Sequence, residues 1–285
     1  MRGNGGGQIH LLDKGRVMAE YGPMQLVISA SIGEVPQVEE CVRAAKESFQ
    51  YLECVARCKD SISVPWHHIS GPVRDEVVLS MVSASRAVGD KDLTPMAAVA
   101  GAIADAVADF LFDRGMTKVV VSNGGDVAIR LAQEHSARIG IGALDSSKGY
   151  PFDIVLDGSR PAWGVATSGL GGRSLTKGIA SHVTVVSTMA AYADAAATAV
   201  ANATFVEDSE VKQSLAEDMD ANTDIRGSMV VTKVGRISEE KIALGLSQGR
   251  ERAESLLARG IILGALIIIK DRVDLVGSLG GVGTN

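Results

Sequence analysis

A long apolar helix followed directly by a strand pair constrains the fold of this chain most. Residues 92–115 (DLTPMAAVAGAIADAVADFLFDRG) carry the clearest helix signals. Thr94 suits the N-cap, Pro95 the first helical position and Gly115 the C-terminal stop. Residues 117–131 (TKVVVSNGGDVAIRL) then have the pattern of a strand, a tight turn and a second strand.

The rest of the chain mixes strands and single helices in the same way. Apolar spacing predicts helices over residues 38–58, 76–88, 187–204 and 238–260, and in part over the polar residues 208–224. Strands are expected at residues 24–30, 137–144, 152–157, 162–169, 182–188 and 228–235. Because strand–helix–strand alternation, repeats and linkers are lacking, we expect one α+β domain over residues 1–285, with largely antiparallel sheets and packed helices.

Charge and composition exclude several classes of protein. The net charge of −6 argues against a nucleic-acid partner. The longest strongly apolar run, residues 260–269, is half the length that a bilayer requires, so no membrane span is expected. This run is predicted to be a buried strand or short helix, and its use in a homo-oligomer stays open. The N-terminus lacks a secretion signal and the three cysteines fit no disulfide framework, which favours the cytoplasm.

Cysteine and histidine residues could suggest a zinc site. Cys54 and Cys58 are followed by His67 and His68, but this spacing matches no closed zinc pattern. Both cysteines fall on a helix with apolar neighbours, so a structural role is expected for them.

Three carboxylates recur every fourth residue on the predicted helix over 92–115. Asp105, Asp109 and Asp113 form a stripe that could bind a cation or simply face solvent. Solvation is favoured for Asp109 and Asp113. Asp105 stays open, since it lies one turn from the small residues around Gly101.

A carboxylate and a hydroxyl share one face of the alanine-rich helix near residue 194. Asp194 and Thr198 are four residues apart, and their oxygens could form half of the shell of a hard cation such as Mg²⁺. The alternative is that Asp194 accepts a hydrogen bond from a neighbouring backbone N–H.

Two glycine-rich segments could approach a ligand with their backbones. Residues 122–126 (SNGGD) read as a hairpin turn whose N–H groups could also face a phosphate or a flat ring. Residues 166–174 (ATSGLGGRS) combine small residues with Arg173, a composition suited to anion contact.

Together these segments resemble the ApbE family, Mg²⁺-dependent flavin transferases that use FAD to attach FMN to a threonine of a target protein. The family's GGIAKGYAVD, GGD, TSG, VTV and ADALATAL motifs appear in order as AAVAGAIAD (97–105), NGGD (123–126), ATSG (166–169), HVTVV (182–186) and ADAAATAV (193–200). The resemblance covers the middle third of the chain well and implies an ApbE-like, T-fold-related architecture.

The resemblance also assigns roles. Asp194 and Thr198 would be metal ligands and catalytic residues, with the backbone carbonyl of Val99 completing the protein's share. The remaining matched residues would line the cleft for FAD: Gly101, Gly124, Gly125, Asp126, Thr167, Ser168, Gly169 and, as an anion contact, Arg173. Mg²⁺ and FAD are therefore the implied cofactors, and the implied partner is a small molecule.

Two departures mark a divergent branch of this family. Ala100 replaces the lysine of the AKG motif, and the family's HIIDP-RTG stretch is missing, so that only residues 170–181 lie there. His182, Arg173 or Lys177 could substitute. Three hypotheses follow: an enzyme that transfers FMN or hydrolyses a pyrophosphate, a protein of this fold that only binds a flavin or another metabolite, and an interaction partner with a relic cleft.

Overall fold

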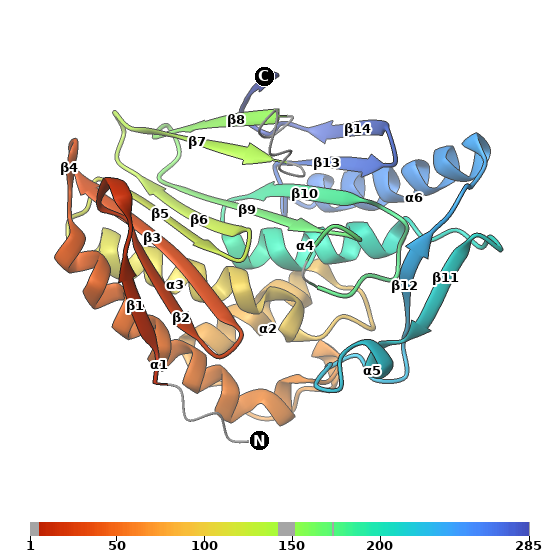
Figure 1. The fold of residues 1–285 in the computed structure, drawn as a ribbon, viewed down its shortest axis with the longest axis horizontal. Helices are drawn as coiled ribbons and strands as arrows, with labels where there is room; N and C mark the ends of the chain where they lie inside the picture. Colours follow the sequence, from red (N-terminus) through yellow and green to blue (C-terminus); the bar gives the residue numbers. More distant parts are fainter. Residues whose placement is uncertain (1–5, 142–151, 173, 285) are drawn as a thin grey trace.

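A ten-stranded sheet runs through the middle of the molecule (Figure 1). The computed structural model describes residues 6–141, 152–172 and 174–284. Neighbouring strands pair antiparallel in the order β1-β2-β3-β5-β6-β9-β10-β13-β14, and β4 pairs with β3. These strands are β1 (Gln8–Leu11), β2 (Val17–Tyr21), β3 (Met24–Ile32), β4 (Val35–Pro36), β5 (Lys118–Asn123), β6 (Asp126–Leu131), β9 (Ala162–Ser168), β10 (His182–Ser187), β13 (Gly264–Ile269) and β14 (Arg272–Gly277).

Helices cover one face of this sheet and a small second sheet covers part of the other (Figure 1). The helices are α1 (Val38–Ile62), α2 (Glu76–Val88), α3 (Val99–Phe112), α4 (Ala190–Ala203) and α6 (Glu239–Ala258), with short 3-10 turns η1 (Asp13–Gly15), η2 (Trp66–His68) and η3 (Pro95–Ala98). The second sheet holds β7 (Ser136–Ile141), β8 (Phe152–Asp157) and β15 (Gly281–Thr284). Beside these layers, β11 (Val211–Leu215) pairs with β12 (Met229–Val234), and α5 (Ala216–Met219) follows β11.

Strand alternation divides the side chains of the central sheet between two cores. Along β6, Val127 and Ile129 pack toward the second sheet, whereas Ala128 belongs to the core under the helices. Asp126 and Arg130 alternate with Val127 and Ile129, so they also lie on the helix side. The candidate site is therefore built on the face that α3 and α4 cover.

The expected fold class is confirmed: the chain is α+β with antiparallel sheets and packed helices. The run over residues 260–269 contains the buried strand β13, which confirms the expectation of a core position. Residues 142–144 of one expected strand lie outside the described residues, as do residues 1–5 and Arg173.

Three expectations about local structure hold only in part. The polar stretch over 208–224 is helical in part, since α5 covers Ala216–Met219, whereas residues 211–215 form a strand because β12 supplies hydrogen-bonding partners that are distant in sequence. The expected helix over 92–115 opens with η3, and α3 proper begins at Val99. The Thr94 side chain makes no capping bond and instead donates its hydroxyl hydrogen to Asp224.

Among the described residues, the helical stretch Pro95–Phe112 is long and apolar enough to cross a membrane by length and composition. From the sequence a helix was expected here, but no membrane span. It lies against the central sheet and α4, and Asp105 within it pairs with a buried arginine, so it packs as the core helix of this fold.

Candidate functional site

Asp194 on α4 contacts the first turn of α3. Its Oδ2 accepts a hydrogen bond from the Gly101 backbone N–H at 3.0 Å. The alternative weighed from the sequence, a bond to a backbone N–H, is thus present, but the donor belongs to another helix. The Ala100 N–H also donates to this carboxylate, so the first turn of α3 orients Asp194.

A second carboxylate, Asp126, lies close enough for its charge to act on Asp194. Burial raises the pKa of Asp126 to about 7, against which a hydrogen bond from the Thr167 backbone N–H acts. Burial, and next the charge of Asp126, raise the pKa of Asp194 well above its usual value. Two partly buried acids that disfavour each other's charge form an environment that attracts a cation.

Hydroxyl groups complete the set of oxygen donors. Thr198 lies one turn after Asp194, and within the described ranges no hydrogen bond to its hydroxyl is found. Ser168 is only 5% exposed, and its Oγ lacks a partner among the described residues. Its place in β9, two residues after the buried Ala166, puts Ser168 on the helix side of the sheet.

The Gly-Gly turn joins β5 to β6 beside these groups. Gly124 and Gly125 have φ values of +65° and +121°, which residues with a side chain rarely adopt. The Gly124 N–H donates to the Gln25 carbonyl at 3.2 Å, so this one of the two glycine N–H groups is already engaged within the fold. Asn123, which sequence reasoning did not single out, donates from Nδ2 to the Ala100 carbonyl at 3.2 Å and fixes the turn against α3.

The segment around Thr167 contributes mainly through its backbone. The Thr167 hydroxyl bonds with that of Thr184 at 2.8 Å on the opposite face of the sheet. Gly169 has a φ of +125°, and an added Cβ would lie 2.8 Å from the Ser181 carbonyl oxygen. This glycine therefore lets the chain turn tightly out of β9. Arg173 lies outside the described residues.

The donor set fits Mg²⁺ better than zinc. Among the described residues no group of three or more His, Cys, Asp or Glu side chains gathers, and the Cys54, Cys58, His67 and His68 set forms no such group. Carboxylate, hydroxyl and carbonyl oxygens, such as those near Asp194, are the ligands of a hard cation.

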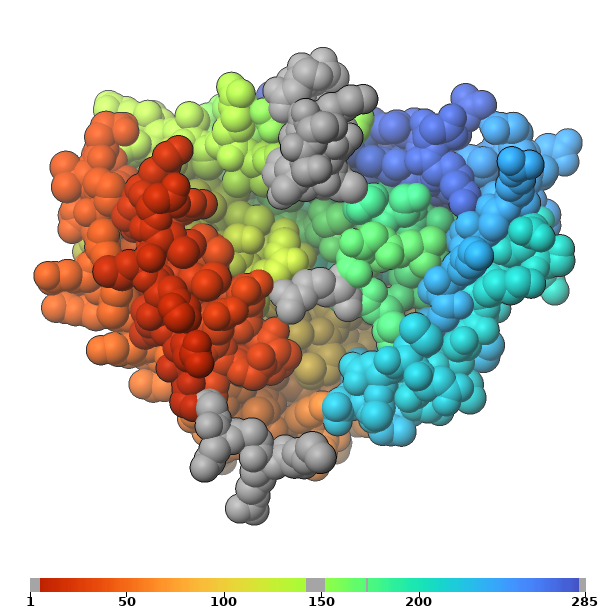
Figure 2. All heavy atoms as spheres, viewed as in Figure 1, coloured from red at the N-terminus to blue at the C-terminus, as the bar shows by residue number. Residues whose placement is uncertain are grey.

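An apolar cavity of about 520 Å³ adjoins this site. The turn between β2 and β3, one face of α1 and the start of α3 line it, and it includes Val99, Ala100 and Asn123. Figure 2 shows the surface hollowed beside the red N-terminal strands, with yellow atoms at its base. A cavity of this size and character suits a planar or apolar part of a small ligand.

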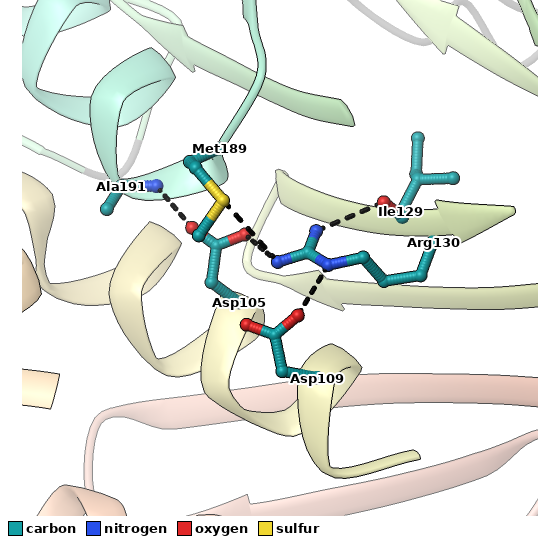
Figure 3. Close-up of polar contacts among 6 residues, drawn as sticks. All are labelled: Asp105, Asp109, Ile129, Arg130, Met189 and Ala191. Carbon is teal, nitrogen blue, oxygen red and sulfur yellow. Dashed lines mark hydrogen bonds and ion pairs between the residues drawn. The ribbon is translucent and has the colours of Figure 1, made fainter. Parts of the chain in front are cut away.

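A buried arginine that sequence reasoning missed lies behind the site (Figure 3). Arg130 donates to Asp105 at 3.0 Å and to Asp109 at 2.6 Å. Asp109 was expected to be solvated; its side chain is 47% exposed, but it is also paired with this cation. The sequence left open whether Asp105 binds a cation, and in the structure its carboxylate pairs with the Arg130 guanidinium. The strand pattern DVAIRL, with an arginine at a buried alternate position, was the available signal.

Two of the three suggested substitutes for the missing family residues, Lys177 and His182, do not join the site, and Arg173 lies outside the described residues. The Lys177 ammonium pairs with Asp92 at 2.6 Å. His182 alternates with the core residue Val183 and so lies on the sheet face opposite α4, and burial lowers the pKa of its imidazole.

Comparisons with known proteins show the family of this chain. A sequence profile of the family described as AbpE bacteria matches residues 9–275. A UPF0280 protein of Methanoregula boonei is 33% identical over 207 residues, which cover 69% of this chain and 84% of that protein. A UPF0280 protein of Methanothermobacter thermautotrophicus is 34% identical over 173 residues, or 56% and 67% of the two chains.

Solved structures are similar at low identity. The apo flavinyl transferase ApbE of Pseudomonas stutzeri aligns with a TM-score of 0.48 and 11% identity, over 95% of this chain and 94% of that one. The flavin transferase ApbE of Vibrio cholerae aligns with a TM-score of 0.41 and 14% identity, over 96% and 98%.

Proposed function

The chain belongs to the ApbE-like family, and from this premise we propose that it binds FAD, or another anionic nucleotide-like molecule, together with Mg²⁺. The proposed reaction breaks the pyrophosphate, releases AMP and passes FMN to water or to a protein hydroxyl. The three cysteines are free, which agrees with a cytoplasmic protein.

The pairing of Asp126 and Asp194 supports this proposal most directly. Both carboxyl groups have raised pKa values, because burial is opposed only in part by the hydrogen bonds that Asp194 accepts from the Gly101 and Ala100 N–H groups and that Asp126 accepts from the Thr167 N–H. Two carboxylates beside an unpartnered hydroxyl are stable in the charged state when a cation lies between them.

Each part of the site has a task in this reaction. Asp194 and Thr198, with the Val99 carbonyl, would hold Mg²⁺, which when bound offsets the charge of the pyrophosphate and polarises the phosphorus. The first turn of α3 orients Asp194 through the Gly101 N–H. The cavity beside Ala100 receives an apolar or planar part of the ligand and excludes water from it.

A binding protein without catalysis is the second candidate. Ala100 puts a methyl group where the family has a lysine, and Lys177 is engaged by Asp92. Among the described residues that line the cavity, Lys59 is the one cation, and its ammonium donates to the Asn222 carbonyl at 3.2 Å.

Incubation of the protein with FAD and Mg²⁺, with AMP measured over time, distinguishes the two candidates. The catalytic proposal predicts AMP release that Asp194→Ala abolishes, while Asp60→Ala, at an exposed position on α1, retains it. Flavin binding without AMP release would support the second candidate. No binding of FAD in the presence of Mg²⁺ would refute the flavin form of both candidates.

A further inference from the structure

Helices α3 and α4 cap each other. The N-cap residue of α3, Ala98, and that of α4, Met189, make no side-chain capping bond. Asp194 of α4 instead accepts the Gly101 N–H in the first turn of α3. Asp105 of α3 accepts the Ala191 N–H in the first turn of α4 at 2.9 Å. Each helix therefore supplies the carboxylate that the other helix needs at its N-terminus.

The backbones of α3 and β9 lie so close to the start of α4 that neither Gly101 nor Gly164 has room for a side chain. A Cβ added at Gly101 would lie 2.3 Å from the Ala190 carbonyl oxygen, and one at Gly164 of β9 would lie 2.2 Å from the Ala190 nitrogen. The first turn of α4 is thus held between α3 and the sheet. A small tilt of α4 would move Asp194 relative to the Val99 carbonyl.

Arg130 fixes the carboxylate that sets this tilt. The Arg130 and Asp105 side chains are each only 3% exposed. Asp105 accepts from the Arg130 guanidinium at Oδ1 and from the Ala191 N–H at Oδ2, so both oxygens of its carboxylate are held in place (Figure 3). Arg130 also donates to the Ile129 carbonyl at 3.1 Å and lies 3.7 Å from the Met189 sulfur. The guanidinium thereby ties β6 to both helices.

We propose that Asp105 and Arg130 are positioning residues for the metal site, which hold the start of α4 so that Asp194 and Thr198 meet the first turn of α3 at ligand distance. This inference rests on the proposed function, because it assumes that Asp194 and Thr198 bind Mg²⁺. Neither positioning residue touches the cation. Their effect is expected on metal affinity, as for groups that orient the ligands in other metal sites.

The test measures Mn²⁺ binding to the full-length protein by electron paramagnetic resonance, with the folded fraction of each variant determined by circular dichroism. Asp105→Asn keeps the shape of the side chain but loses the ion pair, and we expect it to weaken Mn²⁺ affinity about 10-fold or more. Arg130→Lys retains the charge without the fork of donors, and should lose less affinity than Arg130→Met. Asp274→Asn is the matched control, since it breaks another arginine–aspartate pair, with Arg250, between α6 and β14.

Wild-type Mn²⁺ affinity in folded Asp105→Asn and Arg130→Met, alongside loss of binding in Asp194→Asn, would overturn the positioning role and leave the proposed function intact. If Asp105→Asn does not fold, the ordering of Arg130→Lys and Arg130→Met decides in the same way. No Mn²⁺ binding by the wild-type protein, or undiminished binding by Asp194→Asn, would overturn the proposed function and the positioning role together. Equal losses in Asp274→Asn would also overturn the positioning role, because any broken ion pair would then have the same effect.

Discussion

Replacing Asp126 by asparagine should stabilise the metal-free protein at alkaline pH. The pKa of Asp126 is raised from 3.8 to about 7, so the folded chain holds this proton over a pH range in which the unfolded chain has lost it. The free energy of unfolding therefore falls as pH rises from about 4 to about 7. Above pH 7 the whole of this loss is present. At 1.36 kcal/mol per pKa unit, that cost is about 4 kcal/mol. The amide of Asp126→Asn carries no charge and can still accept the Thr167 N–H.

Urea denaturation of both proteins in EDTA, at pH 4 and pH 8, checks this expectation. At pH 4, where Asp126 is protonated in the folded wild-type protein, the two unfolding free energies should agree within about 1 kcal/mol. At pH 8 the variant should be more stable by up to about 4 kcal/mol, and added Mg²⁺ should stabilise the wild-type protein more than the variant. A variant that is no more stable than wild type at pH 8 would show that the Asp126 carboxylate is compensated within the fold, which removes the main reason to expect a cation there.

Three further substitutions test the packing and the cavity. Gly101→Ala should cost about 3 kcal/mol in unfolding free energy, because its Cβ would lie 2.3 Å from the Ala190 carbonyl oxygen. Gly281→Ala, where the nearest atom is at 3.8 Å, should cost little in the same denaturation assay. Equal costs would contradict the close approach of α3 to α4. Met96→Trp should fill the cavity and weaken FAD binding at least tenfold by fluorescence titration while Mn²⁺ affinity is kept, and unchanged FAD affinity would place the ligand elsewhere. Ala100→Lys should strengthen FAD binding by a charge contact that weakens with salt, and an affinity independent of ionic strength would exclude that contact.

Local signals sufficed for most of the elements but not for those that depend on distant partners. The hairpin at Gly124 and Gly125 was predictable because its turn requires positive φ values that favour glycine. The strand over 211–215 was not, because its polar residues alternate weakly and β12, which stabilises it, starts at Met229. Strands β1 and β2 likewise gave too little pattern to be predicted.

In the candidate site, too, the local arrangement was predictable and the contacts between distant segments were not. The positions of Asp194 and Thr198 on one helical face follow from their spacing. That Asp126 lies near Asp194, and that Arg130 pairs with Asp105, depends on how β6 packs against α3 and α4. The sequence indicates that a buried strand carries charged residues, but only the packed structure identifies the groups that they face.

The alanines of α4 explain why its one carboxylate is informative. This helix lies between the central sheet and the helices α2, α3 and α6, and almost every alanine in it is buried. Small side chains allow that close packing, and a charged group in such a helix is unfavourable unless something compensates it. The Gly101 N–H compensates one oxygen of Asp194, while the neighbouring Asp126 makes the charge less favourable still. Asp194 caps the N-terminus of α3, a role that alanine at position 194 could not serve, and under the proposed function a cation would also balance the charges of both carboxylates.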